Sequence, residues 1–255
     1  MARIARSKEI VLTFDLEEYS VPMEFGEKIG PDFSASERAL DYLLSACEKA
    51  TYFTTIGFAK KFPGRIREIA KKGNEIALHG EIWQARQEKR ALEKICKRKV
   101  VGFRAHMFRA KREEIAGLAK EGFLYDSSIN KTVVPGRYSN FGRVPRKIGE
   151  IVELPITAPL GLPLSFVWFR IFPFGALKAL SIVSGDSPQV HYFHPWEFSK
   201  VKAGRHPLAK LSAYGCGTEA FKEKFEKFFA WEEATRGARF SLACEAAASF
   251  SRAFR

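Results

Sequence analysis

The sequence predicts an α/β fold, a (β/α) barrel of seven or eight strands formed by one domain over residues 1–255. Two observations lead to this prediction. Short apolar and β-branched runs alternate with helix-like stretches along most of the chain, which is the order of parallel βα units. No internal repeat, low-complexity tract or long Pro/Gly/Ser linker divides the chain.

The elements of the first half follow one another in this alternating order. The first strand, Ile10–Phe14, is apolar and β-branched and runs into an acidic cluster. Leucines at three- and four-residue spacing indicate a helix over Ser36–Ala50, and a second helix over Pro63–Lys72 has proline in its first turn and Gly73 as its stop. The other expected elements are strands at Thr51–Ile56, Glu75–Leu78 and Val100–Arg104 and helices at Gln87–Lys97 and Lys111–Glu121.

The second half continues the pattern around one long apolar stretch. The stretch over residues 159–185 suggests a membrane span, but it contains Arg170 and Lys178, and charges near the centre of a bilayer are costly. We therefore expect a loop followed by a buried or interfacial helix. The other expected elements are strands at Phe123–Tyr125, Ile151–Ile156 and Gln189–Phe193, a helix at Thr218–Arg236 and a last strand-like run at Ala238–Cys244.

The net charge of +13 raises the question of a nucleic-acid partner. The cations are spread along the chain and mixed with glutamates, as in residues 222–227, and this pattern is typical of solvated helix faces. We therefore expect no nucleic-acid partner, whereas attraction to an anionic membrane surface or an acidic glycan is compatible with the charge.

The 46% of hydrophobic residues, including 23 Phe, indicates a sizeable buried core.

The cysteines and the start of the chain favour the cytoplasm. The four cysteines are widely separated and form no C-x-x-C pair, so neither a disulfide framework nor a zinc finger is expected. The basic start, residues 1–8, runs directly into the first strand without the apolar segment and cleavage site of a signal peptide. We expect a cytoplasmic protein with no integral membrane segment.

Titratable residues recur directly after the expected strands, where barrel enzymes carry their functional groups. A single Asp or Ser in such a position is usually a helix cap or a turn residue, so the argument depends on the repetition. The candidates are Asp15 and Glu17 after the first strand, His79 after the third, Arg104 and His106 after the fourth, Asp126 after the fifth and His194 after Gln189–Phe193.

Five ordered motifs span residues 9–200. They are Thr13–Tyr19, Ala50–Gly80, Gly102–Ala105, Tyr125–Ser128 and Tyr192–Glu197. In this order they resemble the motifs of the polysaccharide deacetylases, the NodB homology family also classified as carbohydrate esterase family four. The resemblance implies a distorted (β/α) barrel of NodB type that hydrolyses an N-acetyl or related amide group, usually on an amino sugar of a glycan. Residues 201–255 add a C-terminal helix and the last strand.

The resemblance also implies a role for each matching residue. Asp15 matches the general base, and Arg104 matches the arginine that orients it. His194 matches the general acid or stabiliser. Glu17 and His79 match ligands of a divalent metal ion, for which zinc is expected. Amide hydrolysis needs these groups, because a base activates water, a positive charge stabilises the oxyanion and an acid protonates the leaving amine.

The chain departs from the family pattern at three positions that bear on the metal. Leu16 stands where many relatives have a second Asp, and Trp83 stands where they have a second metal-binding His. His106 stands where the family more often has proline. It could replace the missing ligand, since imidazole suits zinc, or it could simply form a hydrogen bond in the cleft. Trp83 and Asp126 are expected to contact substrate, with a turn role as the alternative for Asp126.

Three functions are open at this point. The leading one is hydrolysis of a non-peptide carbon–nitrogen bond, the deacetylation of an N-acetylated sugar or glycan. The second keeps Asp15 but uses no metal, as in family members that act on small amide or ureide substrates such as allantoin. The third is a degenerate glycan-binding protein without catalysis. The presence of Asp15, Arg104 and His194 favours a catalytic function. Trp83, in place of the second metal-binding His, is evidence against the family's usual metal site.

Overall fold

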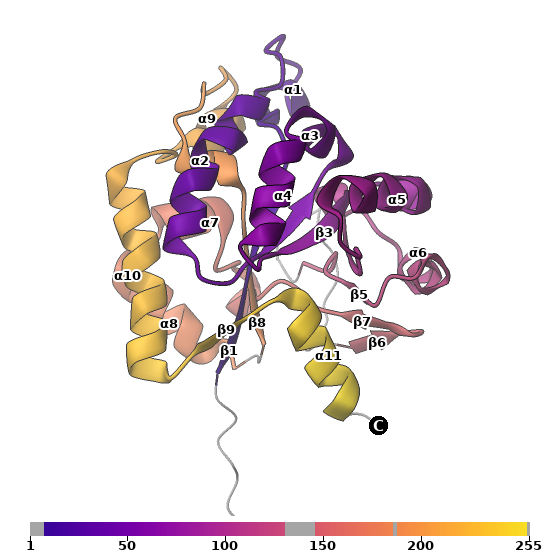
Figure 1. Cartoon of the computed structure of the whole chain (residues 1–255). Helices are drawn as coiled ribbons and strands as arrows, with labels where there is room; N and C mark the ends of the chain where they lie inside the picture. Colours follow the sequence, from indigo (N-terminus) through magenta and orange to yellow (C-terminus); the bar gives the residue numbers. More distant parts are fainter. Residues whose placement is uncertain (1–7, 131–145, 186–187, 254–255) are drawn as a thin grey trace, which may run out of the picture.

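The described strands form one curled sheet in a computed structural model that covers residues 8–130, 146–185 and 188–253. Within these ranges eight strands follow the order β6-β7-β5-β4-β3-β2-β1-β8 and curl into a half-barrel (Figure 1). The arrangement confirms the predicted α/β fold. The strands are β1 (Glu9–Leu16), β2 (Thr51–Thr54), β3 (Glu75–Gly80), β4 (Gly102–Ala105), β5 (Tyr125–Asp126), β6 (Arg146–Ile148), β7 (Ile151–Glu153) and β8 (Gln189–Phe193).

Parallel pairing brings the carboxyl ends of these strands to the same end of the half-barrel. Every neighbouring pair in the order is parallel except β6 and β7, which form a hairpin. A short further strand, β9 (Arg239–Ser241), pairs in parallel with the start of β1. The basic residues 1–7, which entered the prediction of a cytoplasmic protein, lie outside the described part of the chain.

The outer edge of β8 is joined to the segment that follows β7. Thr157 N donates to Val190 O at 2.9 Å, and Val190 N donates to Thr157 Oγ1 at 2.8 Å. These two bonds form a seam between the two sides of the half-barrel.

Helices surround the sheet (Figure 1). They are α1 (Val21–Glu24), α2 (Phe33–Ala46), α3 (Ile56–Lys61), α4 (Pro63–Lys71), α5 (Ala85–Cys96), α6 (Arg112–Gly117), α7 (Phe166–Ile171), α8 (Phe174–Val183), α9 (Pro207–Ala213), α10 (Glu219–Arg236) and α11 (Ala243–Ala253). The apolar stretch 159–185 forms a loop, α7 and α8, as predicted. No helix in the described ranges combines the length with the apolar character that a membrane crossing requires.

Helix α3 differs from the prediction, which extends the second strand to Ile56. The strand ends at Thr54 instead. The Thr55 hydroxyl accepts a hydrogen bond from Phe58 N at 3.2 Å and caps the new helix. A threonine that reads as a β-former in the sequence therefore acts as a helix cap.

The C-terminal end also differs from the prediction of a strand-like run over Ala238–Cys244. Only the three residues of β9 are extended, and α11 follows. The N–H groups of Ala243 and Cys244 donate to Thr51 Oγ1 at 2.9 Å and to Glu75 Oε2 at 3.0 Å, so two side chains satisfy the first turn of α11. Both acceptors lie at the amino ends of strands, so α11 covers the end of the barrel opposite the carboxyl ends.

Alternate residues of each strand face different cores. On β8, Val190 and Tyr192 belong to the cluster inside the barrel, whereas His191 and Phe193 contact phenylalanine rings of α10 outside it. His194 follows on the inner side, because successive side chains point to opposite faces. His191 therefore lies on the opposite face of the strand from His194.

Candidate active site

A pocket of about 100 Å³ opens at the carboxyl ends of the strands. Its lining contains five of the residues that were predicted from their places after strands, namely Asp15, Glu17, His79, His106 and His194. Arg104 lies directly behind Asp15 and is fully buried. Residues so distant in the sequence converge because each lies at the carboxyl end of a strand or directly after it, and period-two alternation turns its side chain inward.

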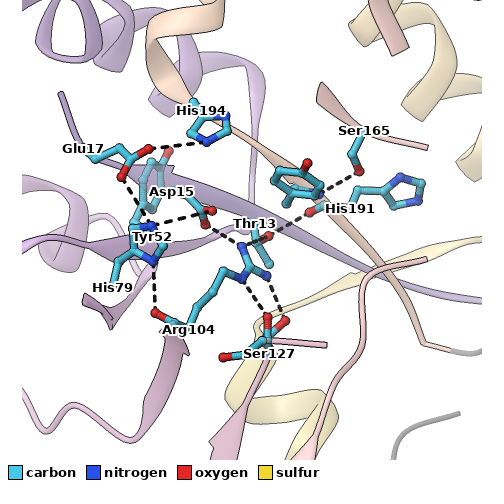
Figure 2. A network of polar contacts seen from close by, with 12 residues as sticks. Thr13, Asp15, Glu17, Tyr52, His79, Arg104, Ser127, Ser165, His191 and His194 are labelled. Carbon is cyan, nitrogen blue, oxygen red and sulfur yellow. Dashed lines mark hydrogen bonds and ion pairs between the residues drawn. The ribbon is translucent and has the colours of Figure 1, made fainter. Parts of the chain in front are cut away.

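Asp15 is held in place by Arg104 (Figure 2). Arg104 Nη1 donates to Asp15 Oδ1 at 2.5 Å and to Thr13 Oγ1 at 2.9 Å. The other side of the guanidinium is fixed by Ser127, whose carbonyl and hydroxyl oxygens accept from Nε at 3.0 Å and from Nη2 at 2.9 Å. Asp15 Oδ2 is left on the side of His79, 4.0 Å from its Nε2. One oxygen of the carboxylate is therefore fixed, and the other faces the pocket.

The Glu17 carboxylate lies at the centre of three imidazoles. Glu17 Oε2 is 3.3 Å from His79 Nε2 and 3.3 Å from His106 Nε2, and Glu17 Oε1 is 3.5 Å from His194 Nε2. His79 Nδ1 donates to Arg104 O at 3.0 Å, because a carbonyl oxygen only accepts. In the neutral ring this bond leaves Nε2 with its lone pair toward Glu17.

The charges in this cluster set the protonation of its members. Burial alone would raise the pKa of Glu17, but hydrogen bonds from His106 and His79 outweigh it and lower the pKa well below its ordinary value. Burial opposes protonation of His79, yet the Asp15 and Glu17 carboxylates raise its pKa. The hydrogen bond with Glu17 likewise raises the pKa of His106. The cluster therefore favours a charged carboxylate and protonated rings more than these groups would be favoured in isolation.

Glu17, His79 and His106 fit a divalent metal ion. One ligand atom from each of them lies within 4.8 Å of the others. A carboxylate oxygen and two imidazole nitrogens form a donor set that catalytic zinc sites use. The bond from His79 Nδ1 to Arg104 O is the kind of outer contact that orients a metal-binding histidine. The described chain therefore contains a His/Glu cluster able to hold an ion although Trp83 replaces the expected second His.

His194 is oriented by two residues that the sequence did not single out for chemistry. Glu197 Oε1 accepts from His194 Nδ1 at 3.1 Å and from His194 N at 2.8 Å. Glu197 is fully buried, and its second oxygen forms an ion pair with Arg170 of α7. Arg170 in turn donates to the carbonyl oxygens of Tyr214 and Ser212, at 2.8 Å and 2.5 Å.

The Glu197–Arg170 pair escaped the sequence analysis for a physical reason. The two residues lie on segments that meet only in the folded chain. The apolar neighbours of Arg170 made it look like an interruption of a hydrophobic stretch. The only signal in the sequence was the capping-box spacing of Glu197, three residues after His194.

Besides Arg104, two of the predicted site residues lie outside the pocket. Asp126 is fully buried on the other side of β5 from its neighbours Tyr125 and Ser127, and it accepts hydrogen bonds from Ser128 N at 2.9 Å and Ser128 Oγ at 2.7 Å. Its contacts are those of a turn residue. Trp83 lies just beyond β3 in a short 3₁₀ turn (Ile82–Gln84) and is 79% exposed.

The pocket wall is aromatic, and part of it has a strained backbone. Phe108, Phe166, Tyr192 and Trp196 line the wall, and the His194 ring stacks on Trp196 with centroids 4.7 Å apart. Phe108 and Phe166 have φ values of 56° and 53°, as does their neighbour Met107 at 54°. Positive φ is costly for residues other than glycine and persists where the surroundings enforce it, often at functional sites.

The comparison with known sequences finds one partial relative and no matching family model. A peptidoglycan deacetylase-like protein, FGM2, from Gibberella zeae is 32% identical over 96 residues, a match that covers 32% of this chain and 28% of that protein. The chain thus spans little more than a quarter of this relative's length.

Solved structures match nearly the whole chain. A protein from Mycobacterium smegmatis assigned as a polysaccharide deacetylase has a TM-score of 0.65 at 20% identity, covering 100% of this chain and 93% of that one. A protein from Pseudomonas aeruginosa PAO1 with the same assignment has a TM-score of 0.57 at 15% identity, covering 96% and 90%. The PuuE allantoinase has a TM-score of 0.59 at 13% identity, covering 98% and 92%. These matches establish the fold.

Proposed function

We propose that the protein hydrolyses an N-acetyl amide on an amino sugar of a glycan or sugar conjugate, with a divalent ion, zinc, held by Glu17, His79 and His106. The observation that carries the proposal is the convergence of a fixed Asp15 carboxylate, the His/Glu cluster and His194 in one pocket. Base, electrophile and acid are the three groups that amide hydrolysis requires.

Asp15 is the proposed general base. Arg104 holds Oδ1, so Oδ2 is the oxygen that can take a proton from a water molecule in the pocket. The guanidinium also keeps the carboxylate in one orientation. The guanidinium is itself oriented by its hydrogen bonds to Thr13 and Ser127. An ion on Glu17, His79 and His106 would polarise the substrate carbonyl and lower the pKa of water toward ~7.

His194 is the proposed general acid. Its Nδ1 proton is used in the bond to Glu197, so Nε2 is the atom that can deliver a proton to the leaving amine. Burial lowers the pKa of His194, and an imidazolium with a lowered pKa gives up its proton more readily. The aromatic rings around it keep bulk water away from this transfer.

The two alternatives explain less of the pocket. A metal-independent hydrolase of small amides, similar to an allantoinase, leaves the cluster of Glu17, His79 and His106 without a role. A non-catalytic glycan-binding protein leaves the fixed Asp15 without one. Trp83 remains a proposed sugar contact outside the pocket, and the cytoplasmic location expected from the sequence stays a prediction.

Acetate release from purified protein tests the proposal. The protein is stripped with a chelator, reloaded with zinc, and incubated with N-acetylated chitotriose, with N-acetylated peptidoglycan fragments and with allantoin. We expect acetate from the glycans only in the zinc-loaded protein, and none from Asp15→Asn. Chelator-resistant hydrolysis of allantoin would favour the metal-independent alternative, and glycan binding without any acetate would favour the non-catalytic one.

A further inference from the structure

Helices α1 and α9 form one wall of the pocket and carry exposed side chains on their outer surface. Val21 and Phe25 from the first helix region and Ser212 of α9 line the pocket. The two helices are joined, because the Phe25 ring stacks on the His206 ring with centroids 4.3 Å apart. Glu27 strengthens the joint by accepting hydrogen bonds from the N–H groups of residues 205 and 206, each at 2.8 Å. In Figure 1 both helices lie at the top of the molecule.

Four large apolar side chains point outward from this wall, which we call the α1–α9 rim. Met23 is 46% exposed, Leu208 52%, Leu211 43% and Tyr214 63%. Leu208 and Leu211 are three residues apart on α9 and therefore share one face of the helix. Ala209 is buried beneath them, so this face has no partner within the described part of the chain.

The α9 side of the rim is basic, whereas α1 carries the exposed Glu24. No Asp or Glu occurs between Glu197 and Glu219. The same interval contains four exposed cations, Lys200, Lys202, Arg205 and Lys210. Glu27, the acidic residue that contacts this interval, already accepts two backbone hydrogen bonds there. The α9 side of the rim thus combines leucine and tyrosine with positive charge.

We propose that the α1–α9 rim docks the protein on an anionic lipid bilayer. Apolar side chains enter the boundary between headgroups and acyl chains, cations pair with anionic headgroups, and tyrosine suits the interface because one end is apolar and the other polar. A second copy of the chain fits the rim poorly, because a symmetric contact would bring like charges together. An acidic glycan would use the cations but leave the leucines exposed to water.

This inference is independent of the proposed chemistry, because it concerns a surface outside the catalytic groups. Docking would, however, affect which substrates can reach the pocket. The helices that would touch the bilayer also form a wall of the pocket, so docking would place the pocket beside the lipid headgroups.

Vesicle binding tests the proposal directly. The full chain is mixed with vesicles of phosphatidylcholine containing about 30 mol% phosphatidylglycerol, and the bound fraction is measured by flotation. One variant removes apolar contact, Leu208→Ser with Leu211→Ser. A second removes charge, Lys202→Gln with Arg205→Gln and Lys210→Gln. Matched controls change exposed residues elsewhere, Ile182→Ser with Val183→Ser on α8 and Lys71→Gln with Lys72→Gln and Lys94→Gln.

We expect the wild-type protein to bind the anionic vesicles and each rim variant to lose about tenfold or more in partition coefficient, while both controls bind as the wild type does. Binding should fall as salt is raised from about 0.05 to 0.5 M, because the ionic part is screened. Amide exchange of residues 207–214 should slow on vesicles, which gives a reading on the unmutated protein.

Three results would overturn the proposal. The first is a wild-type protein that does not float with anionic vesicles at low salt, and the second is equal loss of binding in the control variants. The third is a result showing that the rim binds an acidic glycan or a second copy of the chain instead of a bilayer. Hyaluronate binding that depends on the three cations but not on the leucines would identify an acidic glycan. A dimer in sedimentation velocity that Leu208→Ser with Leu211→Ser dissociates would identify a second copy.

Discussion

Arg104 Nη1 lies 2.5 Å from Asp15 Oδ1, and neither side chain is more than 2% exposed. The guanidinium carbon also lies 4.0 Å from the centroid of the Phe53 ring, so the cation is enclosed on its remaining side. A buried cation that donates a hydrogen bond to a carboxylate favours its charged form and fixes its direction. Arg104, a buried residue of the barrel, therefore orients the carboxylate that is proposed as the general base.

Replacing Asp15 with Asn should abolish hydrolysis, because an amide cannot accept a proton from water. We expect turnover to fall by about 10²–10⁴-fold. The unfolding free energy should fall by about 1–3 kcal/mol, since Arg104 keeps an acceptor but loses the opposite charge. Acetate release and thermal melting measure the two effects. Glu18→Gln, which changes another carboxylate of the pocket, is the control. Unchanged turnover in Asp15→Asn would exclude Asp15 as the base.

Much of this architecture could be predicted from the sequence, because it depends on local patterns. Short apolar and β-branched runs predicted the strands, and the positions of Asp15, His79 and His194 after those runs predicted their convergence. The orientation of His194 depends instead on Glu197 and Arg170. Arg170 belongs to a distant segment, and only tertiary packing decides which buried charges become partners.

Removing His106 should lower metal content and activity together. We expect His106→Ala and Glu17→Ala each to weaken zinc binding by more than the 10–100-fold typical of changes outside the first ligand shell. Two remaining ligands are too few for a stable catalytic site. Zinc content of the purified proteins and a competition titration give the measurement, and His206→Ala, outside the pocket, is the control. A His106→Ala protein that retains stoichiometric zinc would mean that another residue supplies the third ligand.

Changing Glu197 to Gln should disturb His194 without removing it. A glutamine that turns its oxygen toward Arg170 directs its NH₂ group at His194 Nδ1, which favours the wrong imidazole tautomer. We expect kcat to fall by about 10²–10⁴-fold with a small change in KM. The ¹⁵N chemical shifts of the His194 ring report the tautomer directly, and Glu197→Asp should restore it in part. Identical shifts and unchanged kcat in Glu197→Gln would assign Glu197 a purely structural role.

The protein should lose stability in mild acid through His191. Burial lowers the pKa of His191 to about 4 from its ordinary 6.5, while Nδ1 donates to Leu164 O at 2.8 Å. A group with a depressed folded pKa contributes stability that is present above 6.5 and is lost as the pH falls toward 4, here up to about 3 kcal/mol. Denaturant unfolding between pH 7 and 4 measures the loss. His191→Gln keeps a hydrogen-bond donor and should show a shallower decline, whereas a decline identical to that of the wild type would exclude this residue.

Trp83 should affect binding rather than turnover. Its exposed ring can stack on a sugar outside the pocket, and such a contact is worth about 0.5–1.5 kcal/mol. We therefore expect Trp83→Ala to raise KM for N-acetylated chitotriose by about two- to tenfold and to leave kcat unchanged. The effect should vanish with N-acetylglucosamine, which is too short to reach both places. An equal rise in KM for the monosaccharide would contradict this role.

The seam between Thr157 and Val190 gives the strand before His194 a different kind of support from the strands that carry the other site residues. Asp15, His79 and Arg104 lie on or directly beside β1, β3 and β4, which are paired on both edges. His194 follows β8, whose outer edge is joined to the rest of the barrel partly through side chains, because Thr157 Oγ1 and Ser165 Oγ accept from the N–H groups of Val190 and Tyr192. The proposed proton donor thus follows a strand with a main-chain ladder on one edge and hydroxyl groups on the other, whereas the proposed base lies on a strand paired on both edges.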